Sequence, residues 1–261
     1  MGKFDGVLLV TDLDGTLFYK GDVSRENCEA IRCFQSEGGL FAVASGRAPS
    51  WLPKWRERFV PNTWSATFNG AILCDAEGKE LVFEHASDPE IVQKGLEAMR
   101  ACPKSEQLFV WGDRAEAYII KQGEEIDPER IPQKIYKCLL RVPTEQSDEY
   151  VETVRRMLEP EYLVMRSWIN GIEFQERGAG KGDALVRLKK LLGNRARLAV
   201  GVGNYENDID LIRAADIGYA VGDATPAVKA VADRITVDCA DHAIAQIVAD
   251  LENSPVLPFQ L

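Results

Sequence analysis

The sequence predicts an α/β fold, in which a core with a doubly wound, mainly parallel sheet carries an inserted α+β domain. Two apolar runs, Val7–Val10 and Leu40–Val43, lead into polar residues, as buried parallel strands do. Predicted helices separate such strands at spacings typical of parallel crossover units. In the middle of the chain the pattern changes to strand pairs joined by tight turns, which indicates an antiparallel sheet.

The composition is that of a globular protein with one large or two modest domains. The chain has 261 residues, of which 46% are hydrophobic and 28% are charged. Its formal net charge is −10 and it contains no basic block, so nucleic acid is not expected as a partner. No apolar run approaches the ~20 residues that span a bilayer, so no membrane association is expected.

The amino terminus and the cysteines point to a cytoplasmic protein. Residues 1–6 lack both the basic and the apolar segment of a signal peptide. The six cysteines are scattered, without a CxxC pair, and are expected to be reduced. Only two histidines are present, His85 and His242, and neither lies in a recognisable catalytic motif. A catalytic triad built on histidine is therefore not expected.

The first 84 residues alternate predicted strands and helices. A strand over 7–11 leads into a polar, glycine-containing connection. Ser24 is a typical N-cap for the next helix, which runs to the stop signal Glu37-Gly38-Gly39, and the following strand ends at Ser45. The elements expected after it are a helix through Trp51 and Phe59, a third strand end over 65–70, and a hairpin of 72–74 with 81–83.

Residues 85–175 have the pattern of a separate α+β domain inserted into the core. A helix starts at Ser87-Asp88-Pro89, which supplies a cap residue and a proline in the first turn. Asn170-Gly171 is a typical hairpin turn. The expected elements are this helix, a hairpin of 108–111 with 117–120, a loop over 121–134, a strand over 138–142, a helix over 147–159, and a hairpin of 162–168 with 172–175.

The alternating pattern returns after residue 175, so residues 1–84 and 176–261 are predicted to form one core domain. Both domains then have ordinary sizes. The elements expected in this last part are helices over 182–192, 206–214, 227–232 and 240–251, strands over 198–202, 217–221 and 234–237, and a proline-rich tail.

Polar residues that could take part in catalysis or binding lie at the ends of the predicted core strands. Asp12 and Asp14 follow the first strand, Ser45 ends the second, and 203–208 follows a later one. Lys181 stands at the start of a helix. Because open α/β sheets bind their ligands at the carboxyl ends of the strands, we expect these residues to lie together.

This set of residues suits phosphoryl transfer. The transferred group spreads negative charge over three oxygens, so catalysis needs cations and hydrogen-bond donors aimed at them. A carboxylate nucleophile such as Asp12 would form an aspartyl-phosphate, and it needs Mg²⁺ and Lys181 to offset its repulsion from the phosphate. Asp14 would protonate the leaving oxygen and then deprotonate the attacking water.

The same residues resemble the four motifs of the haloacid dehalogenase-like phosphatases. Asp12-Leu13-Asp14-Gly15-Thr16, Ser45, Lys181 and Gly203-(x)3-Asn207-Asp208 have the order and spacing of those motifs. Thr67-Phe68-Asn69-Gly70-Ala71 and the large insert between the second and third motifs resemble the Cof-type branch, class IIB. Taken singly, Ser45 also fits a helix cap and Lys181 a surface lysine, so the joint occurrence carries the resemblance.

The resemblance implies a Rossmann-like core, a cap domain, Mg²⁺ as cofactor, and hydrolysis of a small phosphorylated metabolite such as a sugar phosphate. It implies Asp12 as nucleophile and Asp14 as acid/base. The implied metal ligands are Asp12, Asp14 through its backbone carbonyl, Asn204 and Asp208. The residues expected at the phosphate or substrate are Leu13, Ser45, Gly46, Arg47, Asn69, Lys181 and Asn207, with Lys181 also counted as catalytic.

Asn204 departs from the family pattern, which usually has an aspartate there as a direct Mg²⁺ ligand. An amide oxygen can coordinate the ion but removes one negative charge, so we expect weaker Mg²⁺ binding. The departure leaves open a catalytically weakened protein that binds or senses a phosphorylated metabolite. Relatives with similar caps leave open a phosphosugar mutase. The sequence sets neither the substrate nor the oligomeric state.

Overall fold

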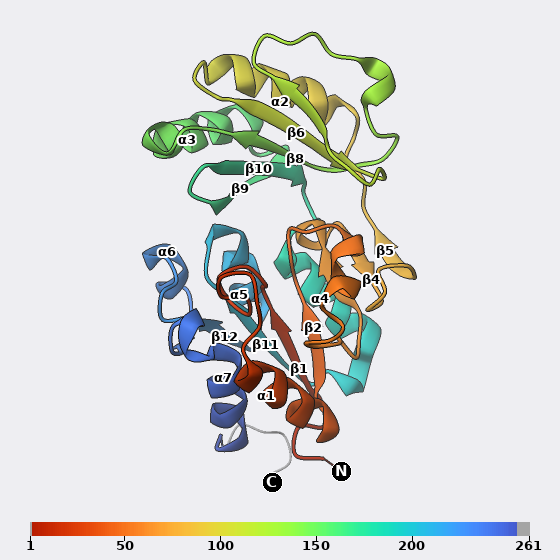
Figure 1. Ribbon diagram of the computed structural model, residues 1–261, viewed down its shortest axis with the longest axis vertical. Coiled ribbons are helices and arrows are strands. Elements are labelled where there is room, and N and C mark those ends of the chain that lie inside the picture. The colour runs from red at the N-terminus through yellow and green to blue at the C-terminus, as the bar shows by residue number, and fades with distance from the viewer. Residues whose placement is uncertain (1, 255–261) are drawn as a thin grey trace. The chain divides into compact units, whose positions relative to one another are not determined.

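The computed structural model describes residues 2–254, and the chain divides into two compact units (Figure 1). The core unit holds the chain before His85 and after Ala179, and the inserted unit holds His85–Ala179. The inserted unit is therefore continuous in sequence, whereas the core unit is assembled from two segments. The proline-rich tail expected from the sequence lies outside the described residues.

The core unit contains a five-stranded parallel sheet with the strand order β13-β12-β11-β1-β2. Every residue of β1, β2 and β12 is buried, as expected for strands that are covered on both faces. Thr11 pairs with Val43 on one side and with Val202 on the other, so three strands end at the same edge. The strands are β1 (Val7–Thr11), β2 (Leu40–Val43), β11 (Leu198–Gly203), β12 (Ile217–Ala220) and β13 (Arg234–Ile235).

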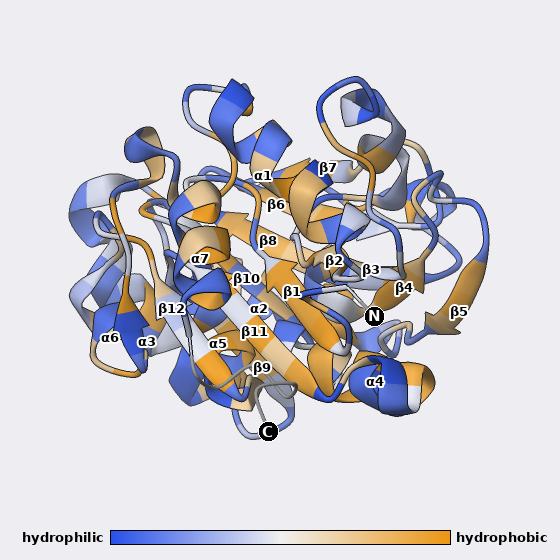
Figure 2. Cartoon of the chain, turned by 90° about the horizontal axis from the view of Figure 1, so that it is seen from below, coloured by the Kyte–Doolittle hydropathy of each residue, from blue (hydrophilic) through white to orange (hydrophobic). Residues whose placement is uncertain are grey.

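Helices cover both faces of this sheet. In Figure 2 one helix pair, α1 (Arg25–Ser36) with α7 (Ala243–Glu252), lies on one face, and α4 (Lys181–Leu192) with α5 (Ile209–Ala214) lies on the other. Figure 2 also shows that the central strands between the two pairs are hydrophobic. The doubly wound α/β fold predicted from the sequence is confirmed.

Several predicted elements of the core unit are shorter in the structure. The helix expected through Trp51 and Phe59 is a 3-10 helix, η1 (Pro49–Trp55), because Pro53 inside it lacks the N–H that a continuing α-helix needs. The segment expected as one helix over 206–214 begins with a 3-10 turn before α5. The expected helix at 227–232 is α6 (Pro226–Lys229), and the last strand is two residues long.

A small antiparallel sheet extends the core unit beyond β2. Ala66 forms a parallel bridge with Ala44, and the Ser45 N–H donates to the Ala66 carbonyl at 2.9 Å. The turn at Phe68–Gly70 is thereby fixed beside Ser45, because the Asn69 N–H also donates to the Ser45 carbonyl at 2.8 Å. The strands are β3 (Ser65–Thr67), β4 (Ile72–Cys74) and β5 (Leu81–Glu84).

The inserted unit is an antiparallel five-stranded sheet, β7-β6-β8-β10-β9, with two helices packed on one face. It has the α+β architecture predicted from its hairpins. Among residues 2–254, no helix is both long enough and apolar enough to cross a bilayer. The elements are α2 (Glu90–Ala101), β6 (Gln107–Gly112), β7 (Tyr118–Lys121), β8 (Ile135–Arg141), α3 (Ser147–Leu158), β9 (Tyr162–Trp168) and β10 (Gly171–Glu176).

Candidate active site

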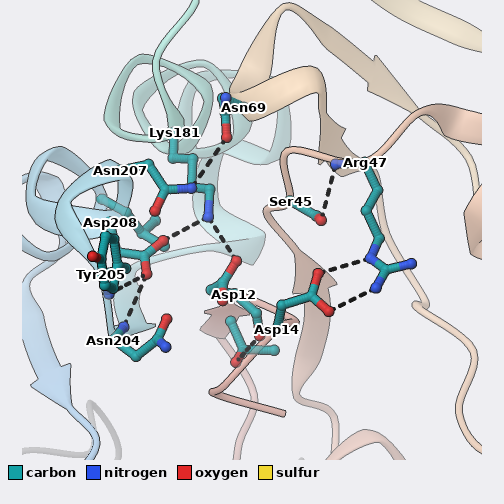
Figure 3. Close-up of polar contacts among 12 residues, drawn as sticks. Asp12, Asp14, Ser45, Arg47, Asn69, Lys181, Asn204, Tyr205, Asn207 and Asp208 are labelled. Atoms are coloured by element: carbon teal, nitrogen blue, oxygen red, sulfur yellow. Dashed lines mark hydrogen bonds and ion pairs between the residues drawn. The ribbon is translucent and has the colours of Figure 1, made fainter. Parts of the chain in front are cut away.

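The carboxyl ends of β1, β2 and β11 bring their flanking residues to one edge of the core sheet (Figure 3). The ladders continue just past the strands: the Asp12 N–H donates to the Val202 carbonyl, and the Ala44 N–H donates to the Thr11 carbonyl, both at 2.9 Å. Asp12 and Ser45 are therefore held by the sheet itself. A site built on strand ends has a more rigid backbone than one built on free loops.

Lys181 is fully buried at this edge and binds two carboxylates. Its Nζ donates to Asp12 Oδ1 and to Asp208 Oδ1, each at 2.6 Å. Lys181 is the first residue of α4, and that position lets its side chain reach the ends of both β1 and β11. An ammonium has three donors, so one N–H of Lys181 is left for a further acceptor.

Charge is unevenly balanced around Lys181, because one ammonium faces two buried carboxylates. Burial, and next the neighbouring Asp208 carboxylate, raise the pKa of Asp12 to about 7, although Lys181 acts in the opposite direction. Burial lowers the pKa of Lys181, but Asp12 and Asp208 outweigh it, and the net shift is upward. Lys181 therefore stays charged, and an added cation near Asp12 would favour its ionised form.

Both carboxylate oxygens of Asp208 accept from protein donors. Its Oδ1 accepts from Lys181, and its Oδ2 accepts from the backbone N–H groups of Asn204 at 2.9 Å and Tyr205 at 3.1 Å. A Cβ at Gly203 would overlap the Asp208 side chain, so a glycine is required at this strand end. Asp208 thus fixes both the lysine and the loop that follows β11.

Asn204 lies against the turn that follows Asp14. Gly15 has a φ of 78°, and a Cβ at this position would overlap the Asn204 side-chain amide. The turn is closed by the Gly15 N–H, which donates to the Phe18 carbonyl at 3.1 Å. The loop after β11 and the loop after β1 therefore meet at Gly15 and Asn204, where Figure 3 shows the Asn204 side chain directed toward Asp14.

Asp14 is held by Arg47 rather than by the lysine. The two side chains form two hydrogen bonds, from Arg47 Nε to Asp14 Oδ2 at 2.7 Å and from Arg47 Nη2 to Asp14 Oδ1 at 2.6 Å. Figure 3 shows the Asp14 carboxylate turned toward Arg47. Because these two donors bind Asp14, they are not available to a substrate in this arrangement. The role of Arg47 at the phosphate or substrate therefore stays a prediction.

Ser45, Asn69 and Asn207 form a second polar group at the same edge. The Ser45 hydroxyl accepts from the Arg47 N–H at 3.2 Å, which leaves its own O–H able to donate. Asn207 Nδ2 donates to Asn69 Oδ1 at 3.3 Å. Phe68 and Asn69 both have positive φ values, 47° and 57°, and such strain is concentrated at functional sites.

Backbone donors complete this arrangement. Within the described part of the chain, the N–H groups of Leu13, Asp14 and Gly46 donate to no protein acceptor. Leu13 itself is buried, and its carbonyl accepts from the N–H groups of Leu17 and Phe18. Unpaired N–H groups at the ends of β1 and β2 can bind the oxygens of an anion.

Two residues that support this site were not predicted from the sequence. Asp210 is partly buried and accepts from the Gly182 N–H at 2.9 Å, which ties the first turn of α4 to α5, and desolvation of its carboxylate raises its pKa. Trp51 stacks on the Arg47 guanidinium, with 4.2 Å between the guanidinium carbon and the ring centre. Asp210 stands only two residues after Asp208, and that spacing was the available signal. Trp51 gave none.

The oxygen atoms at this edge fit a hard divalent cation. The donor set of the Asp12 carboxylate, the Asp14 carbonyl and the Asn204 amide consists of oxygens, as Mg²⁺ prefers. Asp12 Oδ2 accepts from no group within residues 2–254. In the same residues, no three His, Cys, Asp or Glu side chains are arranged to hold a metal, because Asn204 and a backbone carbonyl take the places of acids. This set of oxygen ligands therefore fits Mg²⁺, but only one of the ligands is a carboxylate.

Comparison with known proteins gives consistent results. The family model described as haloacid dehalogenase-like hydrolase matches residues 9–248. The phosphatase YwpJ of Bacillus subtilis is 26% identical over 285 residues, covering 94% of this chain and 99% of the relative. The 5-amino-6-(5-phospho-D-ribitylamino)uracil phosphatase YcsE of the same organism is 26% identical over 250 residues, covering 92% and 94%. A solved structure of the subclass IIB sugar phosphatase BT4131 aligns at 21% identity with a TM-score of 0.75, covering 93% of this chain and 98% of its own.

Proposed function

The chain belongs to the haloacid dehalogenase-like hydrolases and is a phosphatase of small molecules, and we propose that it hydrolyses phosphomonoesters with Mg²⁺ through a phosphorylated Asp12. The observation that carries this proposal is the contact of Asp12 with Lys181. Oδ1 of Asp12 is held at 2.6 Å by a buried ammonium, while Oδ2 is left without a protein donor among the described residues. One oxygen is thus oriented and the other is available as nucleophile.

The residues around Asp12 have distinct roles in this proposal. Asp12 Oδ2 attacks the phosphorus atom, and Asp14 gives a proton to the departing ester oxygen. In the second step Asp14 takes a proton from the water that attacks the phosphorylated Asp12. Lys181, the Ser45 hydroxyl, Asn207 and the backbone N–H groups of Leu13 and Gly46 would bind the phosphoryl oxygens.

Mg²⁺, when bound, would supply positive charge that offsets the repulsion between the carboxylate and the phosphate. We propose that Asp12, the Asp14 carbonyl and the Asn204 amide oxygen hold it. Asp208 already accepts from Lys181 and from two backbone amides. Because these contacts fix both of its oxygens, we propose that Asp208 supports the metal site by holding the loop of Asn204, rather than by direct coordination.

Asn204→Asp is expected to tighten Mg²⁺ binding, because it restores a negative charge to a site that otherwise has one carboxylate. The expected gain is on the order of tenfold in Kd, about 1.4 kcal/mol. Isothermal titration of Mg²⁺ into the wild type and the variant measures it without any turnover. Glu206→Gln, which removes a nearby charge from the same loop, serves as the control for a general electrostatic effect. An unchanged Kd in Asn204→Asp would remove Asn204 from the metal site.

The substrate class proposed is a small phosphorylated metabolite, such as a sugar phosphate. The relatives named above support this, since one is a phosphatase of a phosphoribityl compound and another is a sugar phosphatase. Release of inorganic phosphate from p-nitrophenyl phosphate and from a panel of phosphorylated metabolites, with and without Mg²⁺, tests the proposal. Binding without phosphate release would favour a sensor, and isomerised sugar phosphate without free phosphate would favour a mutase.

The proposed location is the cytoplasm. All six cysteines lie in the described part of the chain, and none of them is in a disulfide. Burial raises the pKa of Cys74 and Cys239 to about 12, so these thiols are unreactive packing groups. Reduced, buried thiols are typical of proteins from reducing compartments.

A further inference from the structure

Arg47 and Asp14 form a pair with two-point geometry at the edge of the site. Nε and Nη2 of the guanidinium each donate to a different oxygen of the carboxylate, at 2.7 and 2.6 Å. This arrangement of a planar fork on a planar carboxylate fixes direction as well as distance. A lysine carries its donors on a single nitrogen and cannot reproduce this planar fork.

Arg47 is itself fixed from several sides. Its guanidinium stacks on Trp51 of η1 at 4.2 Å and lies 5.9 Å from the centre of the Phe18 ring. Its backbone N–H donates to the Ser45 hydroxyl at 3.2 Å, and its carbonyl accepts from the Phe68 N–H at 2.9 Å. The guanidinium is therefore a rigid support for whatever it holds.

Asp14, in contrast, depends on Arg47 for its orientation. Its side chain is 58% exposed, against 28% for that of Arg47. Within residues 2–254, no other side chain donates to its carboxylate. Exposed ion pairs add little to stability, so this pair contributes little to folding. Its effect is to hold a carboxylate that would otherwise rotate freely.

We propose that Arg47 is a positioning residue that holds the Asp14 carboxylate as the base for hydrolysis of the phosphorylated Asp12. This inference rests on the proposed function. In the step concerned, an Asp14 oxygen takes a proton from water as the water oxygen bonds to phosphorus. The bond from phosphorus to the Asp12 oxygen breaks, and its electron pair returns to the Asp12 carboxylate, so that inorganic phosphate is released.

The hydrogen-bond pattern favours the base role over the acid role. Both oxygens of Asp14 accept from Arg47, so the paired group acts as an acceptor. A carboxylate has about four lone-pair sites, and the fork uses two, which leaves sites for a water proton. Acting as a base therefore requires no break in the pair. The first step with a good leaving group such as p-nitrophenolate requires no proton from Asp14 at all.

Arg47→Met is expected to separate the two steps. With p-nitrophenyl phosphate, kcat should fall by about tenfold to a hundredfold because hydrolysis slows. In contrast, kcat/KM should change by less than about threefold, because it reports the steps up to phosphorylation of Asp12. Rapid acid quench should show phosphorylated enzyme accumulating in the variant beyond its wild-type level. A parallel fall of kcat and kcat/KM without accumulation would overturn the proposal.

Two further variants serve as controls. Arg58→Met breaks another Arg–Asp pair of the same unit, Arg58 with Asp22 at 2.7 Å, in which the aspartate is about as exposed as Asp14, and it should leave both constants unchanged. Arg47→Lys keeps the charge but not the fork, and should still accumulate phosphorylated enzyme. Wild-type behaviour of Arg47→Lys would overturn the proposal that the bidentate contact with Asp14 is required. If the wild type itself forms no phosphorylated enzyme and releases no phosphate, it is the proposed function that fails.

Discussion

Asp12→Asn is expected to lower the turnover of p-nitrophenyl phosphate by about 10³-fold or more. An amide can still accept the hydrogen bond of Lys181, but it cannot act as nucleophile toward phosphorus. The loss should appear in kcat, and quench experiments should find no phosphorylated enzyme. Asp22→Asn changes a carboxylate of the same unit away from Lys181, and it should keep full turnover. Residual activity of Asp12→Asn near the wild-type rate would exclude Asp12 as nucleophile.

The loss should not arise from unfolding, and the pKa of Asp12 explains why. Burial raises this pKa from 3.8 to about 7 in the folded protein. The folded chain then binds more protons than the unfolded chain between these values, so this group's contribution to stability is lost as pH rises from about 4 to above 7. The amide of Asn does not titrate, so Asp12→Asn lacks this pH dependence of stability. In Mg²⁺-free buffer at pH 8, the Tm of Asp12→Asn should equal or exceed that of the wild type.

The sequence was sufficient for the parts of the site that rest on strand ends. Apolar runs define buried strands, and parallel strands end at one edge, so the sequence alone predicts that Asp12, Ser45 and the 203–208 loop lie together. Lys181 could be added because a helix start reaches the same edge. These inferences need only topology, and the observed register of β1 with β2 and β11 agrees with them.

The contacts between side chains could not be predicted in this way. Arg47 and Asp14 lie 33 positions apart, and their pairing depends on rotamers and on the turn at Gly15. The two backbone amides that occupy Asp208 also depend on how one loop closes. Hydrophobic periodicity contains no information on such contacts. The 3-10 form of η1 could have been found, since Pro49 and Pro53 both stand in that segment.

Lys181→Met is expected to reduce both activity and stability, and the stability effect tests the charge balance directly. Without the ammonium, the carboxylates of Asp12 and Asp208 remain buried and face each other without a cation. Removal of one partner from a buried ionic cluster costs about 3–5 kcal/mol. Denaturant unfolding in Mg²⁺-free buffer measures this cost. Turnover should fall by about 10²-fold or more, because a donor to the phosphoryl oxygens is also lost.

A double variant separates the lost cation from lost packing. If repulsion between the two carboxylates causes the destabilisation, Asp12→Asn combined with Lys181→Met should be more stable than Lys181→Met alone, because one charge is gone. If the lost packing of the buried lysine stem causes it, the double variant should be no more stable than Lys181→Met. Addition of Mg²⁺ should also stabilise Lys181→Met more than the wild type, since the ion would then be the one cation near Asp12. A variant as stable as the wild type in Mg²⁺-free buffer would contradict the proposed balance of two carboxylates on one lysine.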